Sequence, residues 1–486
     1  MADSVPAPTV PTAPGSLPLL GHSLKLLLDP LDFMASLNEL GPLVRMRGPA
    51  FTPDVYLVNS PELLHQLLVT DARDYGQARI TAGIGSQFGV SLVMDMDFDG
   101  LTLFGSHRRH RRAVQPAFHP HRITAGTPAL RRAVQEAAAQ WCPGRTIRVD
   151  REMASLAYRV NARAVCGDTP ALDRVTAALA AMSSQTTRGL YWRLAVPQLA
   201  HLKHVPGTGS FRRALSDLRT GILAALTHQR GQGAADGSVL SELLRARYAA
   251  PDEPLGDQQI TADTLFLIWA STHGLKEVLP HLFYELARHP DIEQRVHQEV
   301  DSVLDGRPVQ AQDLTSLEYT RRVVKETLRL HPAPWMLGRR TLVPVRLGTA
   351  ELPAGTELAY CTYALHRNPA VHPDPLRFDP DRWLPGPAKT LARCADVPFG
   401  AGVRKCIGDA LTMNQLLTAV ATIAAHWQLR TTPGHRYRPH GRIVISPGPM
   451  PMTCHLRRGR ASASPVAAPE HGAAPADVQG WRRHAN

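Results

Sequence analysis

The sequence predicts a mostly α-helical fold with a smaller β part. Helical patterns of apolar residues fill most of the chain from 106 to about 248 and from 261 to 330, and another follows residue 406. Short runs of β-branched and aromatic residues, bounded by Gly and Pro, predict strands near the N-terminus and between 332 and 360. The chain has 486 residues, of which 44% are hydrophobic and 20% are charged, and this balance supports a large globular core.

The N-terminal part begins with residues 1–18, which are rich in Pro, Ala and Thr, and we expect a disordered lead there. Ser60 precedes a Pro and is expected to cap a helix, because a Ser oxygen accepts hydrogen bonds from the first turn and Pro fits the first helical position. The elements expected in this part are a helix at 29–40, strands at 43–47 and 55–58, and a helix at 61–68.

The second half of the chain contains a long helical pattern from 261 to 287. Pro280 lies inside it, removes one backbone hydrogen bond and is expected to kink the axis. Residues 458–486 are expected to form a disordered tail. The other elements expected are helices at 291–304, 316–330 and about 407–427, and a strand pair near 441–446 and 451–456 around the turn 447–449.

The bulk properties exclude several classes of protein. The net charge is +12, but the basic residues, nearly all Arg, are spread through helical segments and form no nucleic-acid motif. There is no run of about 18 apolar residues, and the first residues lack a signal pattern. The six cysteines have no paired spacing, which favours reduced thiols. We therefore expect a soluble cytoplasmic protein with no nucleic-acid or membrane partner.

The most informative segment is 399–408 (FGAGVRKCIG), where Cys406 lies in a Gly-rich loop just before a helical pattern. Glycines allow tight turns and close approach to a ligand, and free N–H groups tune a metal-binding thiolate. The segment resembles the heme-binding loop of the cytochrome P-450 superfamily. The resemblance implies that Cys406 is the axial thiolate of heme b, with Phe399 and Arg404 as further cofactor contacts. The alternative is a Gly-rich turn with a buried free thiol.

The resemblance covers nearly the whole chain, because the matched motifs fall between residues 14 and 449. It implies a triangular, mostly α prism with smaller β sheets, and a single heme-thiolate catalytic domain at 19–457. This length leaves no room for a fused reductase. The implied partners are therefore a separate ferredoxin and ferredoxin reductase, and a basic face of the protein would suit an acidic ferredoxin.

Glu326 and Arg329 are three residues apart in the helical segment RRVVKETLRLHP and therefore share a helix face. Taken alone, the pair is a generic ion pair. In the resembled family a Glu, an Arg and a second Arg, here Arg382 in FDPDRW, form a charge network that supports the heme loop. Loss of one member would leave an unpaired buried charge.

Basic residues that could hold the heme propionates follow from the same resemblance. His107 and Arg111 are four residues apart before RAVQPAF, so they share a helix face and could both donate to an anion. The resemblance implies that they are propionate donors, that Arg339 is another with Arg340 as runner-up, and that Arg404 is a third. A surface Arg is the alternative for Arg339.

The long helix departs from the family pattern, which carries an acid and a Thr that relay protons toward dioxygen. Counting back from Ala287-Arg-His-Pro290 places His273 and Gly274 at those two positions. Thr272 lies two residues before the Thr position, about 200° around a helix. We expect His273 to deliver protons, with Thr272 as the second candidate. The alternative for His273 is a polar helix residue that faces water.

The segments that the resemblance places around the pocket are apolar, which indicates a small hydrophobic substrate such as a terpenoid or another natural-product intermediate. The expected function is a monooxygenase that uses dioxygen. Two alternatives stay open: a heme-thiolate enzyme of altered chemistry, such as peroxide-driven oxidation, oxidative coupling or rearrangement, and a non-catalytic heme- or ligand-binding protein. The pocket residues expected are Phe88, Phe266, Trp269, Ala270 and Trp335.

Overall fold

The structure is a computed structural model, and it describes residues 10–50, 52–79, 111–112, 114–195, 208–234, 236–249, 256–442 and 444–457. The α-helices are α1 (Ser23–Leu28), α2 (Pro30–Ser36), α3 (Pro61–His65), α6 (Pro120–Ala138), α7 (Val149–Cys166), α8 (Leu172–Ala195), α9 (Thr208–Gly231), α10 (Val239–Ala249), α11 (Asp257–His273), α12 (Leu279–Arg288), α13 (Pro290–Leu304), α14 (Glu318–Leu330), α15 (Thr362–Leu365), α16 (Pro385–Lys389) and α17 (Asp409–Ala424). The strands are β1 (Leu43–Met46), β2 (Val55–Val58), β3 (Tyr75–Gln77), β4 (Thr146–Arg148), β5 (Met336–Thr341), β6 (Val345–Leu347), β7 (Ala350–Leu352), β8 (Glu357–Cys361), β9 (Trp427–Thr431), β10 (His440–Gly441), β11 (Ile445–Ser446) and β12 (Pro451–Leu456).

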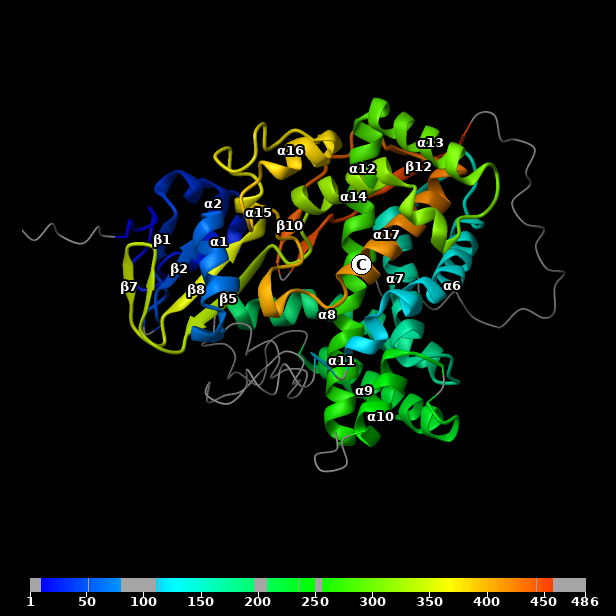
Figure 1. Ribbon diagram of the computed structural model, residues 1–486, viewed down its shortest axis with the longest axis horizontal. Coiled ribbons are helices and arrows are strands. Elements are labelled where there is room, and N and C mark those ends of the chain that lie inside the picture. The colour runs from blue at the N-terminus through cyan, green and yellow to red at the C-terminus, as the bar shows by residue number, and fades with distance from the viewer. Residues whose placement is uncertain are drawn as a thin grey trace, which may run out of the picture.

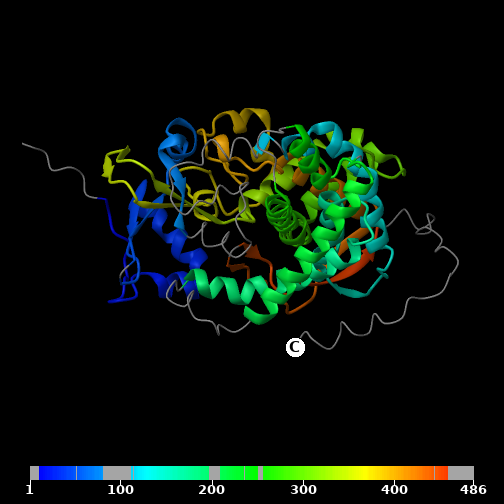
Figure 2. The same cartoon turned by 90° about the horizontal axis from the view of Figure 1, so that it is seen from below.

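An α-rich part and a smaller β-rich part lie side by side (Figure 1). This arrangement confirms the predicted mostly α fold. The long helix α8 runs beneath the molecule toward the N-terminal helices α1 and α2, as Figure 2 shows, and it contacts α1. The described helices include none that is long and apolar enough to cross a membrane.

The β-rich part is built on a five-stranded sheet with the order β1-β2-β8-β5-β3. The β2–β8 pair is parallel, and the other neighbours are antiparallel. Residues inside the expected disordered lead join this sheet: Ala13 is buried, and its N–H donates to the carbonyl of Arg45 at 2.9 Å. Residues 10–18 are thus part of the fold, while 1–9 lie outside the described residues.

Two apolar clusters form the core of the α-rich part. The first lies among α6, α12, α13, α14 and α17, and the second among α8, α9, α10 and α11. Helix α7 contributes to both clusters, with Met153 and Leu156 in the first and Ala162 and Val165 in the second. Burying apolar side chains on both sides of α7 holds α11 and α17 in fixed positions, and these two helices carry the candidate site.

Local signals placed most elements correctly. The Ser60 oxygen accepts a hydrogen bond from the Leu63 N–H at 3.1 Å, so Ser60 caps α3 as predicted. The long helical pattern is interrupted by a π-helical turn, η7 (Gly274–Val278), which separates α11 from α12. Pro280 lies in the first turn of α12, where a missing N–H costs little. The π-helical turn lies just before Pro280, where the sequence predicted a kink.

The predicted strand pair at 441–446 and 451–456 is wrong. β12 pairs with β9 and β4, whereas β10 and β11 pair with each other. The turn at 447–449 looked like a hairpin connection, because Pro and Gly are typical turn residues. The partners that β12 finds are distant in sequence, and no local pattern identifies them.

Candidate active site

The Cys406 loop folds back on itself before α17. The N–H of Cys406 donates to the carbonyl of Phe399 at 2.8 Å, which closes the loop. Gly402 has φ +67°, and a Cβ on it would lie 1.9 Å from the carbonyl oxygen of Leu68. Only glycine fits this left-handed position against a neighbouring backbone. Helix α17 starts at Asp409, slightly later than the sequence predicted.

The thiol of Cys406 is partly enclosed by protein and still accessible. Its side chain is surrounded closely enough that burial raises the pKa of the thiol, although the Gly408 N–H and the charges of Arg111 and Lys405 oppose this shift. Cys406 is nevertheless solvent-accessible. A thiol that is both surrounded by protein and accessible suits a ligand that enters the interior.

The predicted charge network is fully formed behind this loop. Glu326 and Arg329 are completely buried, and Oε1 and Oε2 of Glu326 accept from Nη2 and Nε of Arg329 at 2.7 and 2.9 Å. Arg382 adds a longer contact to Oε1 at 3.4 Å. Glu326 also accepts from the Trp383 indole and the Asp379 N–H, both at 3.0 Å. Every lone-pair direction of the carboxylate is thus used, and the buried charge is fully compensated.

The network reaches the Cys loop through His366. Arg329 Nη1 donates to the carbonyl of His366 at 2.6 Å, and His366 Nδ1 lies 3.1 Å from the Arg329 carbonyl. The other ring nitrogen accepts from the N–H of Val397 at 3.1 Å. Val397 is two residues before Phe399, so α14 is connected directly to the start of the loop. This explains how a helix about 80 residues upstream braces Cys406.

The predicted propionate donors differ from one another in their surroundings. Arg111 Nη1 donates to the Lys405 carbonyl at 2.6 Å and so contacts the Cys loop directly. Arg339 is buried in β5 and donates to the Gly338 carbonyl at 2.8 Å, and Arg404 is half-buried in the loop. His107 lies outside the described residues.

Helix α11 shows an accessible stripe along an otherwise buried surface. The half-buried residues include Ala262, Phe266, Ala270, His273 and Gly274, which follow one another at helical spacing. Phe266 and Ala270 pack against the same apolar cluster as Ile407 of the Cys loop and the adjacent Phe118. The stripe therefore shares an apolar cluster with residues next to Cys406.

His273 is the polar residue at the end of this stripe. Its ring meets Trp269 edge-on with centroids 4.9 Å apart, and Nδ1 is 3.8 Å from Oε1 of Glu277. Neither ring nitrogen makes a hydrogen bond within the described part of the chain. Burial lowers the pKa of His273, although contact with Glu277 opposes the shift. A neutral imidazole with free nitrogens is suited to exchange protons.

The other distal candidates are not on the stripe. The Thr272 side chain is fully buried, and its hydroxyl donates to the carbonyl of Trp269 at 2.8 Å. Trp269 is buried between the helices, and Trp335 is buried in the β-rich part, where its indole N–H donates to the Arg442 carbonyl at 2.6 Å. Phe88 lies outside the described residues.

The sequence interpretation missed two charged residues beside His273. Glu277 is buried, and Lys276 Nζ lies 2.8 Å from its Oε1. Burial alone would raise the pKa of Glu277, but Lys276 and His273 together lower it to about 2. The spacing of an acid four residues after a histidine was the available signal.

The residues around Cys406 fit a heme. The donor set contains one accessible thiol in a Gly-rich loop, and the apolar stripe of α11 packs against the same cluster as Ile407 and Phe118 beside it. A Cβ on Gly408 would lie 3.9 Å from the Cys406 sulfur and 3.7 Å from the Phe118 ring, which are ordinary van der Waals distances. Gly408 and Phe118 therefore lie close to the sulfur on this side. A thiolate in an apolar, Gly-rich setting is the usual arrangement for a heme-thiolate centre.

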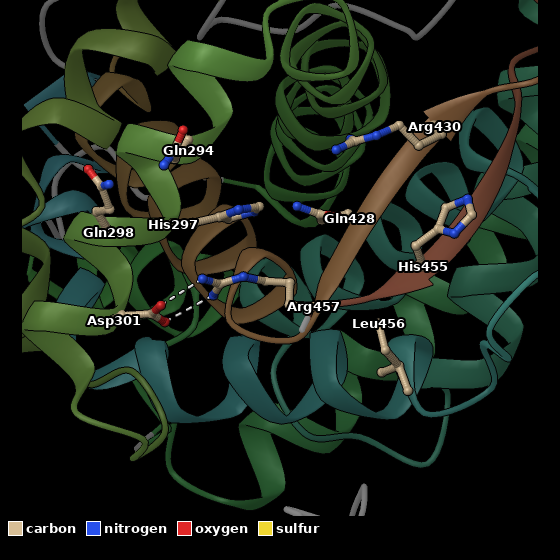
Figure 3. Close-up of a pocket in the computed structure, with 9 residues that line it drawn as sticks. All are labelled: Gln294, His297, Gln298, Asp301, Gln428, Arg430, His455, Leu456 and Arg457. Atoms are coloured by element: carbon tan, nitrogen blue, oxygen red, sulfur yellow. Dashed lines mark hydrogen bonds and ion pairs between the residues drawn. The ribbon is translucent and has the colours of Figure 1, made fainter. Parts of the chain in front are cut away.

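A separate polar groove lies between α13 and the strands β9 and β12 (Figure 3). Arg457 forms an ion pair with Asp301 inside it at 2.6 Å. The groove shares no lining residue with the stripe or with the Cys loop. It therefore does not contribute to the candidate site.

Comparison with known proteins agrees with a heme site at Cys406. The family model described as cytochrome P450 matches residues 180–449. Cyclooctat-9-en-7-ol 5-monooxygenase from Streptomyces melanosporofaciens is 39% identical, over 92% of this chain and 96% of that protein. Pentalenene oxygenase from Streptomyces avermitilis is 33% identical, over 88% and 93%. The solved structure of cyanobacterial CYP120A1 bound to retinoic acid aligns with a TM-score of 0.80 at 23% identity, over 92% of this chain and all of that one.

Proposed function

Because the chain belongs to the cytochrome P450 family, whose members carry heme, we propose that this monooxygenase oxidises a cyclic terpenoid intermediate and that Cys406 is the axial heme ligand. The observation that carries the proposal is the accessible thiol of Cys406 in a Gly-rich loop next to an apolar cluster. Heme supplies the oxygen chemistry, in which one atom of dioxygen enters the substrate and the other leaves as water.

The protein's own residues position the reactants. The buried Glu326–Arg329 pair and His366 fix the Cys406 loop, so the thiolate keeps its direction. Phe266 and Ala270 offer an apolar wall without charges, which favours a hydrocarbon-rich substrate. We assign proton donation in the distal space to His273, because its nitrogens are free of hydrogen bonds in the described part of the chain.

The substrate class is supported by the names of the relatives. Two of them are named as oxygenases of cyclooctat-9-en-7-ol and pentalenene, which are polycyclic terpenoids. The apolar stripe fits a ligand of that kind, since such molecules offer few polar atoms for recognition.

The redox partner is proposed to be an acidic ferredoxin. Exposed basic side chains border the Cys loop, including Arg112 and Lys405, and the chain as a whole carries a net charge of +12. Complementary charge speeds the encounter of two proteins, and the effect weakens in salt. Electron transfer from such a partner should therefore slow as ionic strength rises.

The test of the ligand assignment is the spectrum of the reduced protein under carbon monoxide. We expect the absorption typical of thiolate ligation in the wild type and its loss in Cys406→Ala. Cys142→Ala, which removes an exposed thiol, is the matched control and should leave the spectrum unchanged. A normal spectrum in Cys406→Ala would exclude this residue as the ligand.

The substrate assignment is tested by titrating the heme protein with polycyclic terpene hydrocarbons and alcohols. Displacement of water by a bound substrate changes the heme spectrum, and the expected result is a saturable change followed by hydroxylated product. Turnover with ferredoxin and reductase, set against turnover with peroxide alone, separates a monooxygenase from a peroxide-driven enzyme. Binding of fatty acids in preference to terpenoids would overturn the proposed substrate class.

A further inference from the structure

Five ionisable side chains recur at every fourth position, starting with His273 at the end of the accessible stripe of α11. They alternate strictly between histidine and glutamate: His273, Glu277, His281, Glu285 and His289. Neighbouring members are four residues apart and lie close together on the helix surface, while each step turns about 40°, so the series winds along α11, η7 and α12 to the C-cap residue His289. The first four side chains are buried or nearly so, and only the last, at the end of α12, is substantially exposed, at 29%.

In the outer half of this series, hydrogen bonds connect Glu285 to His331 and both histidine rings to Tyr437. Glu285 Oε1 lies 2.9 Å from Nε2 of His331. At the surface, Nδ1 of His289 donates to the backbone carbonyl of Glu285 at 2.8 Å, and it lies 3.6 Å from Glu285 Oε2, which is an ion-pair distance and not a hydrogen bond. The His331 ring stacks on His281, with centroids 4.2 Å apart and planes 5° from parallel. Tyr437 Oη connects the two rings, at 2.5 Å from His281 Nδ1 and 3.5 Å from His331 Nδ1.

The inner half ends at His273. His273 Nδ1 is 3.8 Å from Glu277 Oε1, and Lys276 holds that carboxylate at 2.8 Å. Glu277 and His281 lie one helical turn apart and interact electrostatically. Nε2 of His281 makes no hydrogen bond within the described residues, so a proton path would need side-chain rotation or one water molecule at this step. The π-helical turn η7 lies between the two halves, and such turns occur often at functional sites.

The charges around the series keep its imidazoles neutral. Burial lowers the pKa of His273, and it lowers the pKa of His281 and His331 much further. The cations Arg288, Arg329 and Arg367 act in the same direction on His331, while Lys276 acts so on His273. The acid Glu277 and the phenol of Tyr158 face Lys276, and Tyr284 stacks on Tyr437. A neutral imidazole has one donor and one acceptor nitrogen, so it can take a proton on one side and release one on the other.

We propose that His289, Glu285, His331, Tyr437, His281, Glu277 and His273 form a proton-conducting ladder from the protein surface to the distal space. The proposal deepens the proposed function, because it rests on His273 as the distal proton donor. Monooxygenation consumes two protons and two electrons for each dioxygen, and the chain lacks the acid and Thr that usually bring those protons in. The Glu277 carboxylate, whose pKa is about 2, has no proton of its own to give, so each proton enters as an excess charge from outside. His289 takes it from solvent, each member accepts it and passes it inward, and Glu277 hands it to His273, which releases it in the distal space. No member gains or loses charge over a cycle.

The test removes one hydroxyl from the ladder and one from beside it. Tyr437→Phe deletes the phenol between His281 and His331 and keeps the ring that stacks on Tyr284 at 4.1 Å. Tyr284→Phe is the matched control, because it deletes a phenol from the same stack outside the ladder. In Tyr437→Phe we expect product formation with dioxygen and redox partners to fall about 100-fold, the lower end of what an acid–base group contributes, with more peroxide released and a larger solvent isotope effect. Tyr284→Phe should match the wild type.

A second variant and a second oxidant guard against misfolding. Glu285→Gln keeps the shape of the side chain but cannot carry a proton, and it should behave as Tyr437→Phe does. Peroxide brings oxygen that is already reduced and protonated, so peroxide-driven turnover of both variants should stay at the wild-type level. Equal loss with both oxidants would point to structural damage and overturn the ladder, as would a Tyr437→Phe enzyme that matches Tyr284→Phe.

An equilibrium measurement tests the ladder without turnover. It can therefore refute the ladder independently of the proposed substrate or activity. In the reduced, carbon-monoxide-bound protein, ¹⁵N spectra of the histidines report the proton on each nitrogen. Removing the Tyr437 hydroxyl should change the signals of His281 and His331 together, and Tyr284→Phe should change neither. A His331 signal that ignores Tyr437→Phe would show that the rings are not connected, and the ladder would be wrong.

Discussion

The backbone of Gly274 lies directly against the side chain of Thr412, which belongs to α17. A Cβ added to Gly274 would lie 2.8 Å from Cγ2 and 3.5 Å from Oγ1 of Thr412. The position at which the family carries a Thr on the distal helix is therefore occupied from the opposite helix. The missing alcohol in this chain has a steric reason, and the glycine is needed for the contact between η7 and α17.

Gly274→Thr, which restores the family's residue, should destabilise the protein. The new side chain overlaps the Thr412 methyl, and overpacking of this kind costs about 1–3 kcal/mol. Thr412→Ser removes that methyl, so the double variant should recover most of the lost stability. Thr412→Ser alone should lower the free energy of unfolding by less than Gly274→Thr does. Urea unfolding of the four proteins gives the coupling free energy. Additive losses would mean that the two positions do not compete for space.

The buried charge network predicts a large difference between two chemically identical changes. Glu326→Gln leaves the completely buried Arg329 without its counter-charge and should lower the free energy of unfolding by about 3–5 kcal/mol. Glu351→Gln breaks the exposed pair with Arg346 and should change it by about 0.5 kcal/mol or less. Denaturant titration measures both. A small loss in Glu326→Gln would mean that the network is not needed for the fold.

The sequence predicted the parts of the site that depend on local pattern. The Cys406 loop, the Glu326–Arg329 pair and the helix that carries His273 each rest on spacing within about ten residues, and the structure has all of them in place. The partner of β12 and the contact between Gly274 and Thr412 depend on segments far apart in the chain. Periodicity within a window holds no information on such contacts.

The ladder shows a different limit. The four-residue spacing from His273 to His289 is visible in the sequence, but spacing alone does not distinguish a solvated helix face from a buried one. Burial and the connection through Tyr437 and His331 become apparent only in the fold, because these two residues come from other segments.

The buried histidines predict that the protein loses stability in acid. Histidines with a lowered pKa outnumber acids with a raised pKa among the described residues. The histidines are His273, His281, His297, His331, His366 and His372, with the pKa of His297 and His372 at about 4. The acids are Glu285, Glu357 and Asp396, with the pKa of Asp396 at about 6.

The sign follows from proton binding. Below about pH 6.5 the unfolded chain protonates its histidines while the folded chain does not, so the free energy of unfolding falls as pH falls. The acids with a raised pKa act in the opposite direction but are fewer. Each histidine in excess of these acids lowers the free energy of unfolding by up to about 1.4 kcal/mol per pH unit. Urea unfolding at a series of pH values between about 7 and 5 checks this, and constant or rising stability over that range would contradict the assignment of neutral buried histidines.

Heme retention should separate Arg111 from its neighbour. Arg111 donates to the Lys405 carbonyl at 2.6 Å, next to Cys406, whereas Arg112 is exposed. Arg111→Gln removes a charged donor from the loop and should speed heme loss about tenfold, because a hydrogen bond to a charged group is worth about 1.5–3 kcal/mol. Arg112→Gln should leave the rate unchanged. Transfer of heme to an excess of apomyoglobin measures both rates. Arg112 lies on the face proposed for the ferredoxin, so Arg112→Gln should instead slow reduction by that partner at low salt. If the two variants behave alike in both assays, Arg111 and Arg112 do not have the separate roles proposed here.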